Sequence, residues 1–293
     1  MSDLLHVFLF EQIAVRGALV QLDESWREIR GLHNYPAPLE RLLGESIVAS
    51  ALLASTIKTT DGALVLQVQG HGPVSLLVAE CSNDFGLRCT ARWDGALSAA
   101  PLGELFGDGR CAITLGGGEG RPVYQGIVPL ESATLAGALE NYMGRSEQLD
   151  TRLWLFASTT GASGLLLQRV PQRSDTDPDA FNRVVHLGAT ATADELCTLS
   201  APALLRRLFP EDDVRLFGGR ALRFRCTCTR ARVRAMLETL GQSEVEQVLA
   251  EQGQVEVTCE FCNRGYVFTP TDCQQLFEAS YPDPSSLREN GSR

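Results

Sequence analysis

The sequence RCTCT at residues 225–229, together with TCEFCNRG at residues 258–265, decides how the carboxyl-terminal part of this chain folds. Two close cysteine pairs separated by a short module are what a tetrahedral site of four thiolates requires, and zinc is the metal typical of such sites. We therefore predict one zinc ion held by four reduced cysteines, with Gly265 supplying the positive φ of the turn behind the second pair. The four expected ligands are Cys226, Cys228, Cys259 and Cys262.

The metal is expected to supply most of the stability of this module. A domain of about 60 residues rarely gains more than about 3–5 kcal/mol from its own core. A structural zinc site contributes about 10–16 kcal/mol in apparent terms. Loss of the metal is therefore predicted to unfold the module.

The first pair has an unusual spacing for a site that is also oxidised. Residues i and i+2 of a strand lie on one face with Cα atoms about 6.5–7 Å apart, whereas disulfides prefer about 4.4–6.8 Å. Joining Cys226 to Cys228 would need a local rearrangement, and an oxidised pair cannot supply two thiolates. Arg225, Arg230 and Arg264 are expected to favour thiolates, which peroxide attacks. A permanently reduced zinc site and an oxidation-sensitive one both fit this spacing.

The rest of the chain divides into segments of different character. Strand and helix patterns in the first 170 residues do not alternate regularly, which favours an α+β fold over a doubly wound sheet. We predict a large mixed sheet-and-helix domain at 1–175, a linker of short helices at 176–223, a zinc-binding domain at 224–285 and a frayed tail at 286–293. A long helix is expected at 36–58, where apolar residues recur every three or four positions.

The linker pattern suggests helices that cannot persist alone. Thr192 and Glu195 have capping-box spacing, and the segment that Ser200 opens stops at Pro210. Isolated helices shorter than about 12–15 residues are marginal in water, so these must dock on another part of the chain. Strands are expected at 4–10, 15–22, 63–69, 74–79, 87–93, 112–115, 123–130, 153–158 and 164–170.

Composition and motifs argue against several classes of function. The formal charge of −10 and the pI of about 5.0 are unlike those of nucleic-acid binders. No apolar run approaches the roughly 20 residues of a membrane span, and the amino terminus lacks a basic leader, so we expect a cytoplasmic protein. No nucleophile motif of the Gly-x-Ser-x-Gly kind occurs, and the glycine-rich run at 115–120 lacks a following Gly-Lys-Ser/Thr, so we expect no enzyme.

Five further cysteines are scattered through the chain. They have no paired spacing, and each is expected to behave as a small buried hydrophobic residue. They are Cys81, Cys89, Cys111, Cys197 and Cys273.

Several longer segments are similar to one known family. Residues 35–58 read YPAPLERLLGESIVASALLASTIK, residues 62–81 read GALVLQVQGHGPVSLLVAEC, and residues 164–171 read GLLLQRVP. With the stretch YQGIVPLESATLAGALENYMGRSEQLDT at 124–151 and the two cysteine pairs, they resemble the 33-kDa heat-shock protein family of redox-regulated chaperones. The resemblance covers nearly the whole chain.

This resemblance implies a function. It implies an ATP-independent holdase of the cytosol that protects unfolding proteins from aggregation under oxidative stress. In such a protein the four cysteines bind zinc when reduced and keep the protein inactive. Oxidants would join Cys226 to Cys228 and Cys259 to Cys262, releasing zinc, unfolding the linker and giving an active form that is commonly a homodimer.

Two other functions remain open on the residues alone. One is a constitutive zinc-ribbon module that binds a partner, with nucleic acid disfavoured by the acidic pI. The other is a thiol-disulfide oxidoreductase that uses Cys259 and Cys262, although no thioredoxin-like βαβ pattern precedes them.

Overall fold

The structure is a computed structural model, and it describes residues 3–57, 62–116, 124–170 and 179–278. The chain divides into two compact units, Met1–Cys226 and Thr227–Arg293. The expected tail at 286–293, the tip of the glycine-rich run and most of the polar stretch around residue 175 lie outside the described residues. No described helix is both long and apolar enough to cross a membrane.

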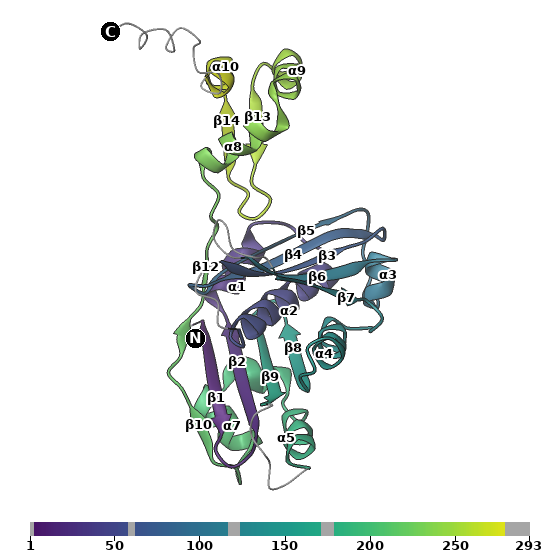
Figure 1. Cartoon of the computed structure of the whole chain (residues 1–293), viewed down its shortest axis with the longest axis vertical. Coiled ribbons are helices and arrows are strands. Elements are labelled where there is room, and N and C mark those ends of the chain that lie inside the picture. Colours follow the sequence, from purple (N-terminus) through teal and green to yellow (C-terminus); the bar gives the residue numbers. More distant parts are fainter. Residues whose placement is uncertain (1–2, 58–61, 117–123, 171–178, 279–293) are drawn as a thin grey trace, which may run out of the picture. The chain divides into compact units, whose positions relative to one another are not determined.

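The first unit contains two sheets (Figure 1). Sheet A has the strand order β10-β1-β2-β9-β8, with β11 also paired to β1, and all of its pairings are antiparallel. Its strands are β1 (Leu4–Phe10), β2 (Val15–Leu22), β8 (Thr151–Ala157), β9 (Ala162–Arg169), β10 (Val214–Leu216) and β11 (Arg220–Ala221).

Sheet B has the order β12-β5-β4-β3-β6-β7. Its pairings are antiparallel except that β12 runs parallel to β5. Its strands are β3 (Ala63–Gln69), β4 (Val74–Ser82), β5 (Gly86–Trp93), β6 (Arg110–Gly116), β7 (Tyr124–Pro129) and β12 (Arg223–Phe224).

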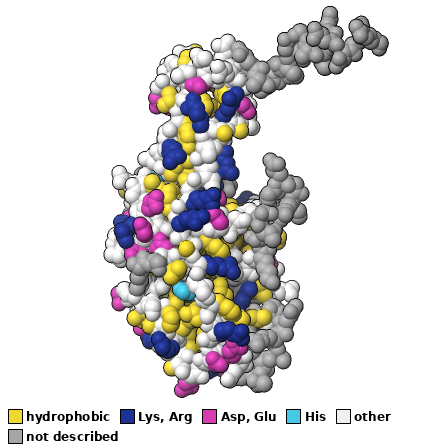
Figure 2. Space-filling view, turned by 90° about the vertical axis from the view of Figure 1, so that its left-hand side faces the viewer, with side chains coloured by type: hydrophobic (Ala, Val, Ile, Leu, Met, Phe, Trp, Pro, Cys, Tyr) yellow, Lys and Arg dark blue, Asp and Glu magenta, His cyan; other side chains and the backbone are white. Residues whose placement is uncertain are grey.

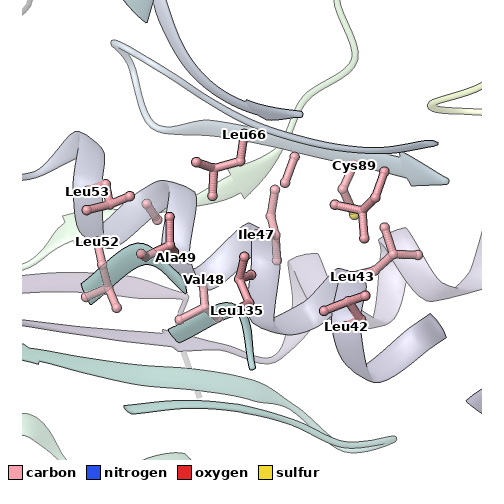
Figure 3. Close-up of a cluster of buried hydrophobic side chains, with 14 of the residues drawn as sticks. Leu42, Leu43, Ile47, Val48, Ala49, Leu52, Leu53, Leu66, Cys89 and Leu135 are labelled. Carbon is pink, nitrogen blue, oxygen red and sulfur yellow. The ribbon is translucent and has the colours of Figure 1, made fainter. Parts of the chain in front are cut away.

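Helix α2 (Ala37–Ala54) lies between the two sheets and packs against strands of both. It is apolar nearly all round because both of its sides are covered, and Figure 3 shows its leucines and Ile47 with Leu66 and Cys89 of sheet B. Gly44 allows a close approach, since a Cβ there would lie 2.4 Å from that of Ala157. The α+β prediction is confirmed. The helices α3 (Leu102–Phe106) and α4 (Leu135–Arg145) complete this core.

Helix α1 (Glu24–Gly31) is not apparent in the sequence pattern. Its first turn is held by a residue about 20 positions earlier, because the Asp3 carboxylate accepts hydrogen bonds from the N–H groups of Asp23 and Ser25, each at 2.6 Å. A carboxylate at a helix amino terminus satisfies unpaired donors and complements the helix dipole. The signal that starts this helix is therefore tertiary.

The linker residues pack on the face of sheet A that points away from α2. Alternation along β2 turns Ala18 and Val20 toward α2, and Val15 and Leu19 toward the linker. The predicted docking of the short helices is thus observed. These helices are α5 (Ala180–Gly188), α6 (Ala193–Thr198) and α7 (Ala201–Leu208). The resulting linker cluster includes Phe8, Phe10, Val15, Leu19, Leu165, Leu167, Phe181, Val184, Leu196, Leu204, Leu208 and Phe209.

The second unit is small, and its described residues, 227–278, include few buried side chains. It contains a two-stranded sheet of β13 (Val255–Thr258) and β14 (Gly265–Phe268). Three helices accompany it, namely α8 (Arg230–Leu240), α9 (Gln242–Gln252) and α10 (Pro270–Glu278). Its hydrophobic core consists of Val233, Leu237, Val245, Val255, Phe268, Cys273 and Leu276.

Candidate metal centre

The four cysteines of the two pairs come together. The Sγ atoms of Cys226, Cys228, Cys259 and Cys262 all lie within 4.8 Å of one another, and all four residues are half-buried. Tetrahedral coordination with Zn–S bonds of about 2.3 Å places sulfur atoms about 3.8 Å apart. The Sγ atoms of Cys228 and Cys262 are 3.3 Å apart, well beyond the roughly 2.05 Å of a disulfide. The four sulfurs therefore fit one tetrahedral metal ion.

The second pair lies in the turn between β13 and β14. Cys259 donates its N–H to the carbonyl of Arg264 at 2.9 Å, and Asn263 donates its N–H to the carbonyl of Cys259 at 2.8 Å. The residue with positive φ is Asn263, at +57°, so the expectation for Gly265 is wrong. The turn closes before Gly265, which already belongs to β14, and asparagine is among the residues that tolerate this conformation.

The first pair lies between a short strand and a helix. Cys226 follows β12, whose neighbour Arg225 donates its N–H to the carbonyl of Leu87 on β5 at 2.9 Å. Cys228 precedes α8, and Thr229 caps that helix by accepting a hydrogen bond from the N–H of Arg232 at 3.2 Å. Both neighbours of the Cys-x-Cys segment are therefore fixed by hydrogen bonds.

Two polar side chains interact with the sulfur atoms of the second unit. The hydroxyl of Tyr266 donates to the Sγ of Cys228 at 3.1 Å, and this hydrogen bond raises the pKa of Tyr266. A hydrogen bond with Tyr266 and the negative charge of Cys228 and Cys262 raise the pKa of Arg264. Arg264 is thus placed to offset thiolate charge, as the sequence suggests.

Two other arginines expected to act on the thiolates have other partners. Arg225 forms an ion pair with Asp84 in the first unit. Arg230 lies 3.2 Å from Asp272 and stacks over the ring of Phe268. These carboxylates offset part of the positive charge of the two guanidinium groups, and the effect of Arg225 and Arg230 on the thiolates stays a prediction.

Arg88 contacts the first pair and is not suggested by the sequence. Its side chain hydrogen-bonds Cys226 and forms an ion pair with Glu80 at 2.6 Å. Arg88 reaches Cys226 because β12 pairs with β5. A parallel pairing between residues about 140 positions apart leaves no local signal in the sequence.

The outlying cysteines are buried, with one exception. Cys81, Cys89, Cys111 and Cys273 are at most 2% exposed, which confirms their expected role. Burial raises the pKa of the first three to about 12, so their thiols are poorly reactive. Cys197 is only half-buried, and its Sγ lies 3.1 Å from the hydroxyl oxygen of Ser163.

Basic side chains are dispersed on the visible surface. On the face shown in Figure 2, the described Arg side chains lie as separate spots among hydrophobic, acidic and other groups. A continuous basic surface, which nucleic-acid binding typically requires, is not present among the described residues of this face.

Comparison with known proteins identifies the family. The family model described as Hsp33 protein matches residues 3–269. The chain belongs to the Hsp33 family. A relative named 33 kDa chaperonin from Methylobacillus flagellatus is 46% identical over 97% of this chain and 98% of its own length. A second, from Nitrosococcus oceani, is 46% identical over 96% of each.

A solved structure has the same fold. The crystal structure of a 33 kDa chaperonin from Thermotoga maritima matches with a TM-score of 0.79, covering 96% of this chain and 99% of that one, at 21% identity. The resemblance noted in the sequence is therefore confirmed. Membership of the Hsp33 family makes the protein a chaperone, which is not a known enzyme class.

Proposed function

We propose that this chaperone is an ATP-independent holdase that is inactive while its four cysteines hold zinc and active once they are oxidised. The observation that carries the proposal is the gathering of two cysteine pairs, distant in sequence, within 4.8 Å of one another. Such a sulfur set suits zinc and excludes harder metals such as magnesium. The expected ligands are Cys226, Cys228, Cys259 and Cys262.

Zinc would hold the second unit folded. Among the described residues 227–278, the hydrophobic core of that unit has seven buried residues, and a core of that size rarely stabilises a domain by more than about 3–5 kcal/mol. Removal of a metal worth about 10–16 kcal/mol would leave the unit unfolded.

The linker connects this loss to a client-binding surface. Cys226 lies two residues after β12, the strand at the carboxyl end of the linker. Release of β12 from β5 would free the linker at its carboxyl end, and its short helices have little stability of their own. Departure of α5, α6 and α7 would uncover Phe8, Phe10, Val15, Leu19, Leu165 and Leu167 on sheet A. An apolar patch of this kind binds unfolding polypeptides.

The chemistry of activation is a two-electron oxidation of each pair. We propose disulfides Cys226–Cys228 and Cys259–Cys262, each formed when two thiolates give two electrons to one peroxide molecule, which takes up protons and leaves as water. A pair so joined cannot donate two thiolates, so zinc leaves. We further propose that the protein acts in the cytoplasm, where the resting state is reduced, and that the oxidised form is a homodimer.

The test compares reduced, zinc-loaded protein with peroxide-treated protein. Zinc release is followed with a chromogenic chelator, and chaperone activity by light scattering of a thermally unfolding test protein. We expect stoichiometric zinc release together with suppressed aggregation. Cys197→Ser is the matched control because Cys197 is a half-buried thiol outside the site, and it should respond as the natural protein does.

Two results would contradict the proposal. Zinc that stays bound at peroxide concentrations that oxidise free thiols would indicate a permanent structural site. Zinc release without a change in aggregation would separate the metal from chaperone activity. Partner binding by the reduced form alone would instead support a constitutive zinc-ribbon module.

A further inference from the structure

A cavity of about 410 Å³ opens at the end of the first core. Its wall is formed by the carboxyl end of α2, strands β3 and β6, and helix α4. The apolar residues that matter here are Leu53, Ile57, Leu64, Ile113, Leu115 and Met143. The volume is in the range of small-molecule sites, which are mostly apolar with a few placed polar groups.

Arg16 on β2 is one of those polar groups, and it is held in place. Its Nε donates to the Oε1 of Gln168 at 2.9 Å, and its Nη2 donates to the same oxygen. Gln168 is completely buried and donates in turn to the hydroxyl of Thr151 at 2.7 Å. The Arg16 guanidinium is therefore oriented by a buried hydrogen-bond network.

The charge of Arg16 has no counterion within the described part of the chain. Among those residues no carboxylate lies within ion-pair distance, and no acceptor lies within hydrogen-bond distance of Nη1, while Nη2 also reaches the carbonyl of Thr56 at 3.4 Å. Burial accordingly lowers the pKa of Arg16. A partly buried cation is costly unless it is paired, so Arg16 favours the binding of an anion at this cavity.

The opposite side of the cavity has the reverse polarity. The hydroxyl of Tyr142 donates to Glu147 at 2.8 Å, and Tyr124 bonds both of these groups. An anionic ligand would be repelled from Glu147 and directed to Arg16, while its apolar part would lie against the leucine and isoleucine wall. We propose that this cavity binds a small monocarboxylate with an aliphatic chain, of the medium-chain fatty-acid class, with its carboxylate on Arg16.

Decanoate is the probe, used well below its micelle concentration. Binding to the reduced, zinc-loaded full chain is measured by isothermal titration calorimetry. Decanol and decyltrimethylammonium have the same chain without the negative charge. We expect saturable binding of one decanoate, weakened roughly tenfold or more for both of the other ligands, because charge-assisted hydrogen bonds are among the strongest.

Three variants locate the site. Arg16→Gln keeps a hydrogen-bonding side chain but removes the charge, and should weaken decanoate binding roughly tenfold or more while leaving decanol binding unchanged. Ile57→Trp fills the cavity while leaving the charge of Arg16 in place, and should weaken both ligands. Arg92→Gln removes an exposed arginine of β5, and should bind decanoate as the natural protein does.

Several results of these binding measurements would overturn the inference. Equal affinity for decanoate and decanol, or undiminished decanoate binding by Ile57→Trp, would overturn the inference, as would the absence of saturable binding. Tryptophan fluorescence checks the fold of each variant. If Arg16→Gln fails to fold, the ligand series and Ile57→Trp still decide the question. No step depends on chaperone activity, so failure here leaves the proposed function untouched.

Discussion

Replacement of Phe209 by alanine should activate the reduced protein without loss of zinc. Phe209 is 2% exposed at the end of the linker helices. Its ring packs edge-on against Phe10 at 5.0 Å between centroids and lies 6.4 Å from Phe8. Truncation of a buried phenylalanine to alanine costs about 3–5 kcal/mol. The lost free energy would weaken the packing of the linker on sheet A, which we propose must separate before the protein becomes active.

The size of this free-energy loss determines how much more often the linker should open. A loss of about 3–5 kcal/mol raises the population of the open linker roughly 10²- to 10⁴-fold. Hydrogen exchange of peptides from 180–209 should accelerate in the reduced, zinc-loaded variant, while peptides from α2 stay protected. Light scattering should show suppressed aggregation of a test protein before any oxidant is added.

Phe217→Ala is the matched control. Phe217 is also a residue of the linker, but its side chain is 41% exposed. Substitutions at the surface usually change the unfolding free energy by no more than about 0.5 kcal/mol. It should leave both exchange and activity unchanged. The reasoning is refuted if Phe209→Ala unfolds the first unit as a whole without faster exchange confined to the linker, or if the linker opens and aggregation is not suppressed.

Three further outcomes are expected. Chelation of the metal under reducing conditions should remove hydrogen-exchange protection from α8 and α9, because their core is small, and leave α2 protected. Thr192→Ala should lower the unfolding free energy of the linker by about 0.5–2 kcal/mol, since Thr192 and Glu195 form a capping box, whereas Thr198→Ala, at the other end of α6, should cost less in a urea titration. Burial raises the pKa of Glu45 from 4.5 to about 7, with Arg41 opposing. The folded state thus holds a proton that the unfolded chain releases, and stability falls as the pH rises through that window, so Glu45→Gln should raise the urea midpoint at pH 8 and gain little at pH 4.

Local patterns predicted most of the first unit. Each long strand of the two sheets alternates apolar and polar residues or is bounded by turn residues, and α2 has helical spacing throughout. The gathering of the two cysteine pairs was also predicted locally, because each pair is identified by one short sequence motif. These features depend on neighbours within a few residues, which a sequence displays directly.

Features that depend on distant partners were not predictable. Strands β11 and β12 have two residues each, too few for any periodicity, and they exist because β1 and β5 offer hydrogen bonds. The hydrogen bond of Arg88 with Cys226 was missed for the same reason, because Arg88 lies on β5 and approaches Cys226 only through the pairing of β12 with β5. Side-chain charge near a thiolate is set by the fold and only loosely by proximity along the chain.

The short strands of the linker have a consequence for backbone recognition. Strands β10 and β11 cover the outer side of β1, and β12 covers that of β5, so one segment closes an edge of each sheet. Departure of that segment would leave two rows of unpaired N–H and C=O groups, which accept any extended polypeptide by adding it as a further strand. Such pairing recognises the main chain of a polypeptide and not its side chains. A client would then need only to be unfolded, whatever its sequence, to be held.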